Sequence, residues 1–134
     1  MSTIGNAPEP VTIIALLVAA VQAEGIVTAD RAQEAQPTIE DLAAAVDALG
    51  GVMTVELKVL RDAQNHKRVG NRVAERINQA IRRVGLEYYP AIQTDQTQKI
   101  RLYRRGSKVD QILHAARDID PRSDEVLRRA ASAL

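Results

Sequence analysis

The near absence of aromatic side chains is the feature that most limits what this chain can fold into. The 134 residues contain no Phe, Trp or Cys, and only three Tyr. An apolar core must therefore be built from Ala, Val, Ile and Leu. Such a core suits helices better than a large sheet, because aromatic residues are among those most enriched in strands. The lack of Cys also excludes disulfide frameworks, thiol redox chemistry and thiolate metal sites.

Residues 1–51 are predicted to form an acidic helical region. Pro10 suits the first position of a helix, because its missing N–H is not needed there. The helix that follows, over residues 11–23, is apolar on almost every side, so we expect it in the centre of the core or at a subunit interface. We favour the interface, and therefore a homodimer held by the N-terminal helices. A capping-box pattern at 38–41 and two glycines at 50–51 bound a further helix.

The longest apolar run gives no sign of a membrane span. Residues 11–21 form a stretch of 11 residues, which as a helix would cross only about half of a hydrocarbon layer of about 30 Å. Residues 1–10 contain no Lys or Arg, unlike the start of a secretory signal. We therefore expect no contact with a membrane and a cytoplasmic location.

Residues 52–64 fit two patterns at once. Apolar residues alternate over 53–59 as in a strand, whereas those at 57–63 also recur as in a helix. We favour a helix, and the choice between strand and helix stays open at 52–60.

The next part of the chain is predicted to form a turn, a helix and a hairpin. A polar turn over 64–70 leads to an amphipathic helix that begins at Asn71 and ends at Gly85. Two short segments at 86–92 and 99–105 have the pattern of strands, and together they indicate a β-hairpin.

Two helices are predicted at the C-terminal end. Ser107 and Asp110 form a second capping-box pattern, and Asp120-Pro121 begins the last helix. The helix after Ser107 carries an apolar stripe that we expect to face the core: Val109, Ile112, Leu113 and Ala116.

The order of helix, turn, helix and two-stranded hairpin over about residues 54–106 resembles a winged helix. The stretch RVAERINQAIRRVGLEYYP at 72–90 is similar to the recognition helix and wing of winged-helix domains in bacterial regulators and in restriction or defence proteins. The resemblance implies that the second helix enters the DNA major groove and that the hairpin touches the DNA backbone. The predicted fold is thus mainly α with a small β-hairpin, a winged helix-turn-helix with an N-terminal helical extension. We divide it into residues 1–51 (core and dimerisation), 52–118 (basic winged-helix region) and 119–134 (C-terminal helix).

A net charge of +1 conceals opposite charges in different parts of the chain. Residues 1–57 hold one base and eight acids, whereas residues 58–117 hold fourteen bases and five acids. A basic region of this kind attracts a polyanion such as nucleic acid, and the acidic region beside it does not. The alternative is that the two regions attract each other and need no outside partner.

The candidate DNA contacts come from the basic region. Four polar side chains fall in one narrow stripe of the helix that begins at residue 71: Arg72, Arg76, Gln79 and Arg83. We expect them to read bases, because Arg can bond guanine through O6 and N7 and Gln can bond adenine. The predicted contacts to the DNA backbone are Lys67, Arg68, Arg82, Lys99, Arg101 and Arg105. The alternative is a solvated helix face, on which Arg is present only because it favours helix formation.

We therefore expect sequence-specific binding of double-stranded DNA by a transcriptional regulator of a bacterium or phage. RNA stays open as a target, because the hairpin tip at 93–98 offers only the acid Asp95. In that case Tyr88, Tyr89 and Tyr103 would stack on single-stranded bases. The main alternative is a protein-interaction module, an inhibitor or adaptor, that binds no nucleic acid.

No common catalytic motif is present. The sequence contains no phosphate loop, Rossmann glycine pattern, G-x-S-x-G elbow or paired-His metal signature. Asp110, His114 and Asp118 lie at i, i+4 and i+8 of one predicted helix, but charge pairs on a solvated face explain this spacing better than a metal site does. We expect no enzymatic activity, no metal and no cofactor.

Overall fold

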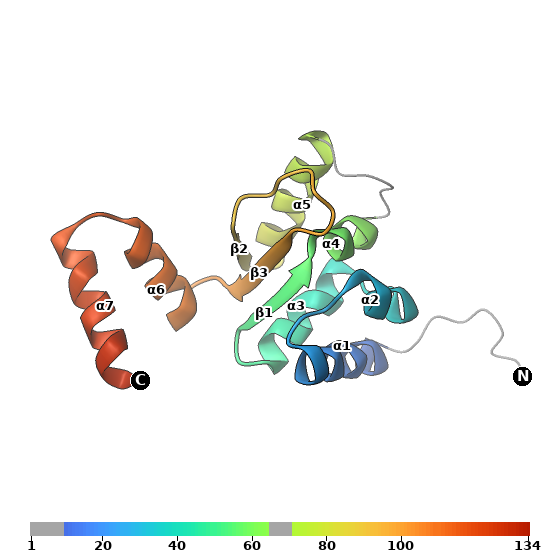
Figure 1. Cartoon of the computed structure of the whole chain (residues 1–134), viewed down its shortest axis with the longest axis horizontal. Helices are drawn as coiled ribbons and strands as arrows, with labels where there is room; N and C mark the ends of the chain where they lie inside the picture. The colour runs from blue at the N-terminus through green and yellow to red at the C-terminus, as the bar shows by residue number, and fades with distance from the viewer. Residues whose placement is uncertain (1–9, 65–70) are drawn as a thin grey trace, which may run out of the picture.

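The computed structural model describes residues 10–64 and 71–134. Within these ranges the chain forms seven helices and one three-stranded antiparallel sheet (Figure 1). The elements in chain order are α1 (Pro10–Glu24), α2 (Ala29–Ala35), α3 (Ile39–Ala48), β1 (Val52–Glu56), α4 (Leu57–Ala63), α5 (Asn71–Arg83), β2 (Leu86–Tyr89), β3 (Lys99–Arg104), α6 (Lys108–Arg117) and α7 (Pro121–Ala133). The mainly helical class that the sequence predicts is confirmed.

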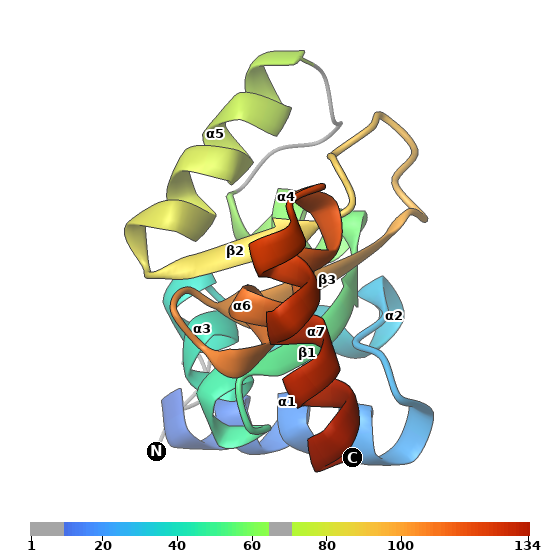
Figure 2. The same ribbon diagram turned by 90° about the vertical axis from the view of Figure 1, so that its left-hand side faces the viewer.

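The three strands pair in the order β1–β3–β2, so β3 is the central strand. Ile100 and Leu102 of β3 are buried on the inner face of the sheet, which packs against α3, α4 and α5. Successive side chains of a strand alternate between its faces, so Arg101 and Tyr103 lie on the outer face. Figure 2 shows α6 and α7 in front of this outer face.

Strand β1 corrects the sequence prediction for residues 52–64. The sequence favours a helix and leaves a strand open at 52–60, whereas residues 52–56 form a strand and residues 57–63 form a helix. The prediction was wrong for 52–56 because β1 pairs with β3 along its whole length, from Val52 opposite Tyr103 to Glu56 opposite Lys99. This partner lies far along the chain, and the local apolar pattern carries no information about it.

The core is aliphatic, as the composition predicts. One continuous cluster draws residues from every element between α1 and β3; its largest members include Leu17, Leu42, Val46, Val55, Leu57, Leu60, Ile77, Ile81, Leu86, Ile100 and Leu102. We refer to residues 10–64 and 71–104, whose elements share this core, as the body.

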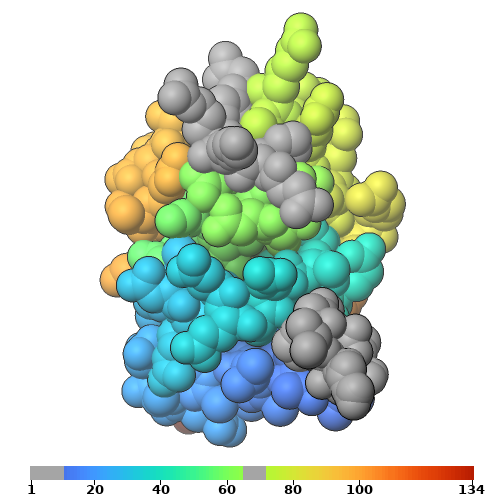
Figure 3. Space-filling view, turned by 90° about the vertical axis from the view of Figure 1, so that its right-hand side faces the viewer, coloured from blue at the N-terminus to red at the C-terminus, as the bar shows by residue number. Residues whose placement is uncertain are grey.

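Helix α1 lies partly in the core and partly at the surface. Ile13, Leu17 and Ala20 are buried, while Val11 is 78% exposed and Leu16 is 42% exposed. Figure 3 shows the N-terminal helices at one end of the body, with α4 and α5 at the other end. Among the helices that the structure describes, none is both long and apolar enough to cross a membrane.

The capping box predicted before α3 is present. The backbone N–H of Asp41 donates to Oγ1 of Thr38 over 3.1 Å, and the N–H of Thr38 donates to Oδ2 of Asp41 over 3.0 Å. These two bonds satisfy N–H groups that the first turn of a helix leaves without partners. α3 therefore begins where the local sequence places it.

Helices α6 and α7 form a hairpin beside the body, and they correct a second prediction. The stripe expected to face the core (Val109, Ile112, Leu113 and Ala116) contributes no residue to the core cluster. Ile112 is 37% exposed. The reason is that α6 packs chiefly on α7 and β3, so the body covers just one side of it.

Candidate nucleic-acid interface

Helix α5 presents one face to the core and the opposite face to solvent. Ile77, Ala80 and Ile81 are buried against the body. Gly85, just beyond the helix, has a φ of 80°, which glycine adopts without strain. This left-handed turn leads the chain directly into β2, so the helix and the strand are fixed relative to one another.

The structure brings the four predicted base-reading residues together. Arg72, Arg76, Gln79 and Arg83 are all exposed, in one stripe of α5 that flanks its buried face. Within the described parts of the chain, no carboxylate pairs with the guanidinium of any of these three Arg. Glu75 is exposed beside them, so the stripe also contains an acceptor that the sequence prediction did not include.

A hydrogen bond that the sequence did not reveal ties α5 to β2. The hydroxyl of Tyr88 in β2 donates to Oδ1 of Asn78 in α5 over 2.7 Å. Burial raises the pKa of Tyr88, while Arg82 opposes this effect. Tyr88 is therefore protonated near neutral pH and available as a donor. An amphipathic pattern locates Asn78 at the border of the helix face, but it does not identify the strand residue opposite.

Two predicted backbone contacts, Arg82 and Arg105, meet at the C-terminal end of α5. Both guanidiniums lie 3.5 Å from the carboxylate of Glu87, and Nη2 of Arg105 donates to the carbonyl of Arg82 over 2.7 Å. These side chains remain half exposed, so the ion pairs contribute little to stability. A phosphate can compete with Glu87 for either guanidinium.

The other two described backbone contacts lie on a different side of the sheet. Lys99 and Arg101 are exposed on β3, on the outer face, whereas α5 packs on the inner side. Arg101 pairs in register with Tyr89, and the guanidinium of Arg117 in α6 lies 4.5 Å from the centre of the Tyr89 ring. Lys67 and Arg68 lie outside the described residues.

The three Tyr do not form a stacking platform for single-stranded bases. Tyr103 is buried, and burial raises its pKa, with Arg117 opposing. Tyr88 is held by Asn78. Only Tyr89 is exposed, and Arg117 covers one side of it.

The loop between β2 and β3, residues 90–98, is tied to α4. The N–H groups of Leu57 and Lys58 donate to the carbonyls of Gln98 and Gln96 over 2.8 and 3.0 Å. The loop thus satisfies two donors in the first turn of α4. Figure 2 shows the loop and α5 on opposite sides of α4, so the loop does not extend alongside the exposed face of α5.

Asp95 in this loop is engaged internally. Its Oδ1 accepts from the backbone N–H and the hydroxyl of Thr97 over 2.9 and 2.7 Å. Both hydrogen bonds lower the pKa of Asp95, and the bond from the Thr97 hydroxyl has the larger effect. The carboxylate is therefore charged at neutral pH, and it gives the loop tip a negative charge.

A basic residue that was not assigned to DNA proves to be structural. Arg104 donates to both carboxylate oxygens of Asp47 over 2.9 and 2.7 Å, and to the carbonyl of Val84 over 2.7 Å. It thereby joins the end of α3 to the end of α5. This bidentate contact is the geometry that Arg favours with carboxylates.

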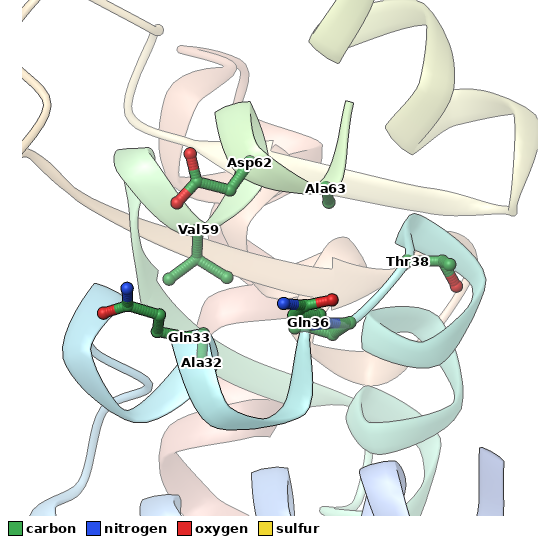
Figure 4. Close-up of a pocket in the computed structure, with 8 residues that line it drawn as sticks. Ala32, Gln33, Gln36, Thr38, Val59, Asp62 and Ala63 are labelled. Atoms are coloured by element: carbon green, nitrogen blue, oxygen red, sulfur yellow. The ribbon is translucent and has the colours of Figure 1, made fainter. Parts of the chain in front are cut away.

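A cavity of about 400 Å³ lies between α2 and α4 (Figure 4). Gln33, Gln36 and Asp62 border it, over a floor that includes Ala32 and Val59. Among the described residues that line it, Asp62 is the one titratable group, and its Oδ1 already accepts from Arg61. A single carboxylate with no second acid or base has no partner for proton transfer, so we assign no chemistry to this cavity.

Asp110, His114 and Asp118 have the spacing of a possible metal site, but two of the three side chains make hydrogen bonds that stabilise the hairpin. Oδ2 of Asp110 accepts from the N–H of Gly106 over 2.7 Å, and Oδ2 of Asp118 accepts from the hydroxyl of Ser123 over 3.1 Å. Among the described residues, no group of three His, Cys, Asp or Glu is arranged to hold a metal ion.

No match to this chain was found among protein-family models, curated proteins or solved structures.

Proposed function

We propose that this chain binds double-stranded DNA in a sequence-specific way, as a winged helix-turn-helix protein. The observation that carries the proposal is the exposed face of α5, where three Arg and Gln79 stand together and no carboxylate pairs with the guanidiniums within the described residues. The element order supports it, since α4 and α5 are followed by the strands β2 and β3.

The dimensions and chemistry of α5 suit a major groove. Its 13 residues give a length of about 20 Å, and a major groove about 12 Å wide admits one α-helix. Arg72, Arg76 and Arg83 offer bidentate donors to guanine, and Gln79 offers a donor and an acceptor to adenine. Glu75 can accept from the amino group of cytosine.

The proposed phosphate contacts divide into two groups. Arg82 and Arg105 lie at the end of α5 and exchange Glu87 for phosphate oxygens. Lys99 and Arg101 lie on the outer face of the sheet and engage a neighbouring stretch of DNA backbone. Such contacts fix the position of a protein on DNA and make affinity dependent on salt.

We extend the proposal to a cytoplasmic transcriptional regulator of a bacterium or phage, without catalytic activity. The homodimer predicted through the N-terminal helices stays part of this proposal, because α1 exposes Val11 and Leu16 at the surface. A protein-interaction module without nucleic-acid binding is the second candidate. The exposed apolar residues Ile112 and Val126 favour that candidate, since apolar surface of this kind marks protein contacts.

Fluorescence anisotropy with a labelled random-sequence duplex, at several salt concentrations, tests DNA binding first. We expect log K to fall with log salt by about 0.9 per phosphate contact. A preferred site selected from random sequences then allows Arg76→Ala and Arg83→Ala to be measured, and each should cost about 1–3 kcal/mol of specific binding.

Arg31→Ala is the control, because it removes one exposed Arg from α2, outside the proposed DNA contacts, where the guanidinium lies 3.5 Å from the carboxylate of Glu24. It should leave specific affinity within error of the parent chain. The absence of binding at low salt, or equal effects of Arg31→Ala and Arg76→Ala, would count against α5 as the DNA contact and in favour of the protein-interaction module.

A further inference from the structure

Two consecutive arginines at the end of β3 hold the C-terminal end of α5. Nη1 of Arg104 donates to the carbonyl of Val84 over 2.7 Å. Nη2 of Arg105 donates to the carbonyl of Arg82 over 2.7 Å, and its backbone N–H donates to the carbonyl of Gly85 over 2.9 Å. A helix leaves its last carbonyls without partners inside the helix, and here three carbonyls at this end accept from the two arginines.

Arg104 also joins this end of α5 to another helix. Its Nε and Nη2 donate to the two carboxylate oxygens of Asp47 in α3 over 2.9 and 2.7 Å. The planar guanidinium presents its donors in a rigid fork, so it can bind the carboxylate and the carbonyl of Val84 at once. Gly85 leaves room for it, because a Cβ there would lie 2.7 Å from Nη1 of Arg104. We call the contact of Arg104 with Asp47 and Val84 the clamp.

The clamp adds a constraint that the apolar face of α5 does not supply. Ile77 and Ile81 are buried against the body, but hydrophobic burial is non-directional. Hydrogen bonds weaken steeply when their angle departs from linearity. The clamp therefore restricts the angle of α5, whereas apolar packing mainly keeps the helix on the body.

The angle of α5 matters most at the end far from the clamp. Arg83 lies beside the clamp, and Arg72 lies 11 positions earlier, or about 16 Å along the helix axis. A tilt of about 10° around the clamped end moves the backbone at Arg72 by about 3 Å. Hydrogen bonds to base edges require donor–acceptor distances of about 2.7–3.2 Å, so such a tilt breaks them.

Contacts to phosphates carry no sequence information and depend mainly on charge and salt. Binding to a random-sequence duplex therefore tolerates a tilt of α5 that base reading does not. Loss of the clamp without a change in net charge should lower the affinity for a specific site and spare the affinity for other DNA.

We propose that Arg104 is a positioning residue for base reading, which holds α5 at the angle that lets Arg72 and Arg76 reach base edges. It acts through Val84 and Asp47 and contacts no DNA itself. The inference rests on the proposed function, because it concerns the same face of α5. It also gives Asp47, an acid of the N-terminal region, a part in DNA recognition.

Arg104→Lys tests the proposal with the net charge unchanged. One ammonium group replaces the planar fork, so Asp47 and Val84 are no longer bound together in the same arrangement. We expect the affinity for a site selected from random sequences to fall about tenfold or more. The affinity for a random-sequence duplex and its salt dependence should stay within about twofold of the parent values. Fluorescence anisotropy measures both affinities.

Arg31→Lys is the control for this substitution. The guanidinium of Arg31 also faces a carboxylate, that of Glu24 at 3.5 Å, but it lies on α2 and outside the proposed DNA contacts. Both affinities should match those of the parent chain. Circular dichroism checks that each variant is folded, because equal losses for the two duplexes would reflect a smaller folded fraction.

Asp47→Asn tests the clamp from its other side, and here electrostatics and positioning predict opposite signs. The substitution removes a negative charge, so a purely electrostatic role predicts tighter binding of both duplexes. The clamp predicts weaker binding of the selected site, because a neutral amide cannot accept a bidentate, charge-assisted contact from Arg104. The side chain of Asp47 is more than half exposed, so the body should stay folded.

A distance measurement without DNA tests whether the clamp fixes α5. The chain has no Cys, so spin labels attach only at the exposed positions changed by Glu40→Cys in α3 and Glu75→Cys in α5. Pulsed electron paramagnetic resonance gives the distribution of distances between the labels. Arg104→Lys should broaden or displace this distribution, and Arg31→Lys should leave it as in the parent.

Three results would overturn the proposal: an unchanged distance distribution in Arg104→Lys, equal losses of affinity for the two duplexes, or tighter binding of the selected site by Asp47→Asn. A parent chain that binds no duplex removes the proposed function, and the distance measurement then still decides whether Arg104 fixes α5. A parent chain that binds its selected site as tightly as Arg104→Lys does removes the positioning role and leaves the proposed function in place.

Discussion

Helix α1 and the α6–α7 hairpin are both rich in apolar side chains, but they use them in different ways. α1 lies across α2 and α3, so Ile13, Leu17 and Ala20 become part of the core. The hairpin meets the body chiefly along β3, and Val126 and Ile112 stay partly exposed. The comparison shows that an apolar stripe alone does not determine whether a helix becomes part of the core. The position of the helix in the fold decides how much of that surface the core covers.

The largest expected effect contrasts a buried side chain of α1 with an exposed one of α7. Leu17→Ala should lower the free energy of unfolding by about 2–5 kcal/mol, because it leaves a cavity in a close-packed core. Val126→Ala should change the unfolding of the body by about 0.5 kcal/mol or less, as a surface substitution does. Urea unfolding followed by circular dichroism in dilute protein measures both. Equal losses would mean that the hairpin belongs to the same cooperative unit as the core.

Two glycines, one in the body and one just before the hairpin, allow the same substitution to be compared in both regions. Gly85 and Gly106 have nearly the same φ, 80° and 79°, so alanine is strained at both positions by about 1 kcal/mol. At Gly85 a Cβ would also lie 2.7 Å from Nη1 of Arg104, whereas at Gly106 it would meet nothing within 4 Å.

We therefore expect Gly85→Ala to lower the free energy of unfolding by about 1 kcal/mol more than Gly106→Ala, because the Arg104 contacts must shift. Thermal and urea unfolding of the two variants measure the difference. If both substitutions cost the same, Arg104 gives way easily and does not fix the end of α5.

A smaller effect is expected at the tie between α5 and β2. Tyr88→Phe removes the hydrogen bond to Asn78 and should cost about 0.5–1.5 kcal/mol of stability. Tyr89→Phe is the control, because Tyr89 is exposed on the outer face and no hydrogen bond of its hydroxyl is present among the described residues. Urea unfolding should rank the two variants in this order, and the reverse order would contradict a positioning role for Tyr88.

The smallest expected effect concerns alkaline pH. Burial raises the pKa of Tyr103 above the unfolded value of about 10. Its contribution to stability is therefore complete below pH 10, and it is lost as the pH rises through the pKa of the folded state. Deleting residues 107–134 exposes the ring and should bring this pKa down toward 10.

Tyrosinate absorbance measured against pH, with Tyr103→Phe to identify the signal, checks this expectation. An unchanged pKa after the deletion would show that the body, and not α6, buries the ring.

Several features of the fold and of the candidate site could be predicted from local sequence. The capping box of Thr38 and Asp41 depends on residues three apart, so a short stretch of sequence contains all of it. The exposure of Arg72, Arg76 and Arg83 follows from the regular 3.6-residue turn once Ile77 and Ile81 are taken as buried.

Other features could not be predicted because they depend on partners far along the chain. Residues 52–56 form a strand only because β3 provides a neighbour that arrives more than 40 residues later. Glu87 pairs with both Arg82 and Arg105, and Arg104 pairs with Asp47. No periodic pattern in the sequence indicates these pairs.

By itself, the sequence determined an aliphatic and mainly helical protein, with an acidic N-terminal region and a basic α5 whose polar stripe faces outward. These properties follow from side-chain chemistry and helical periodicity, which act over a few residues. The tertiary structure alone decided that β1 joins the sheet, that the 90–98 loop caps α4, and that the α6–α7 hairpin lies outside the core. Each of these depends on which surfaces meet in space, and the free energy of such contacts is absent from any local pattern.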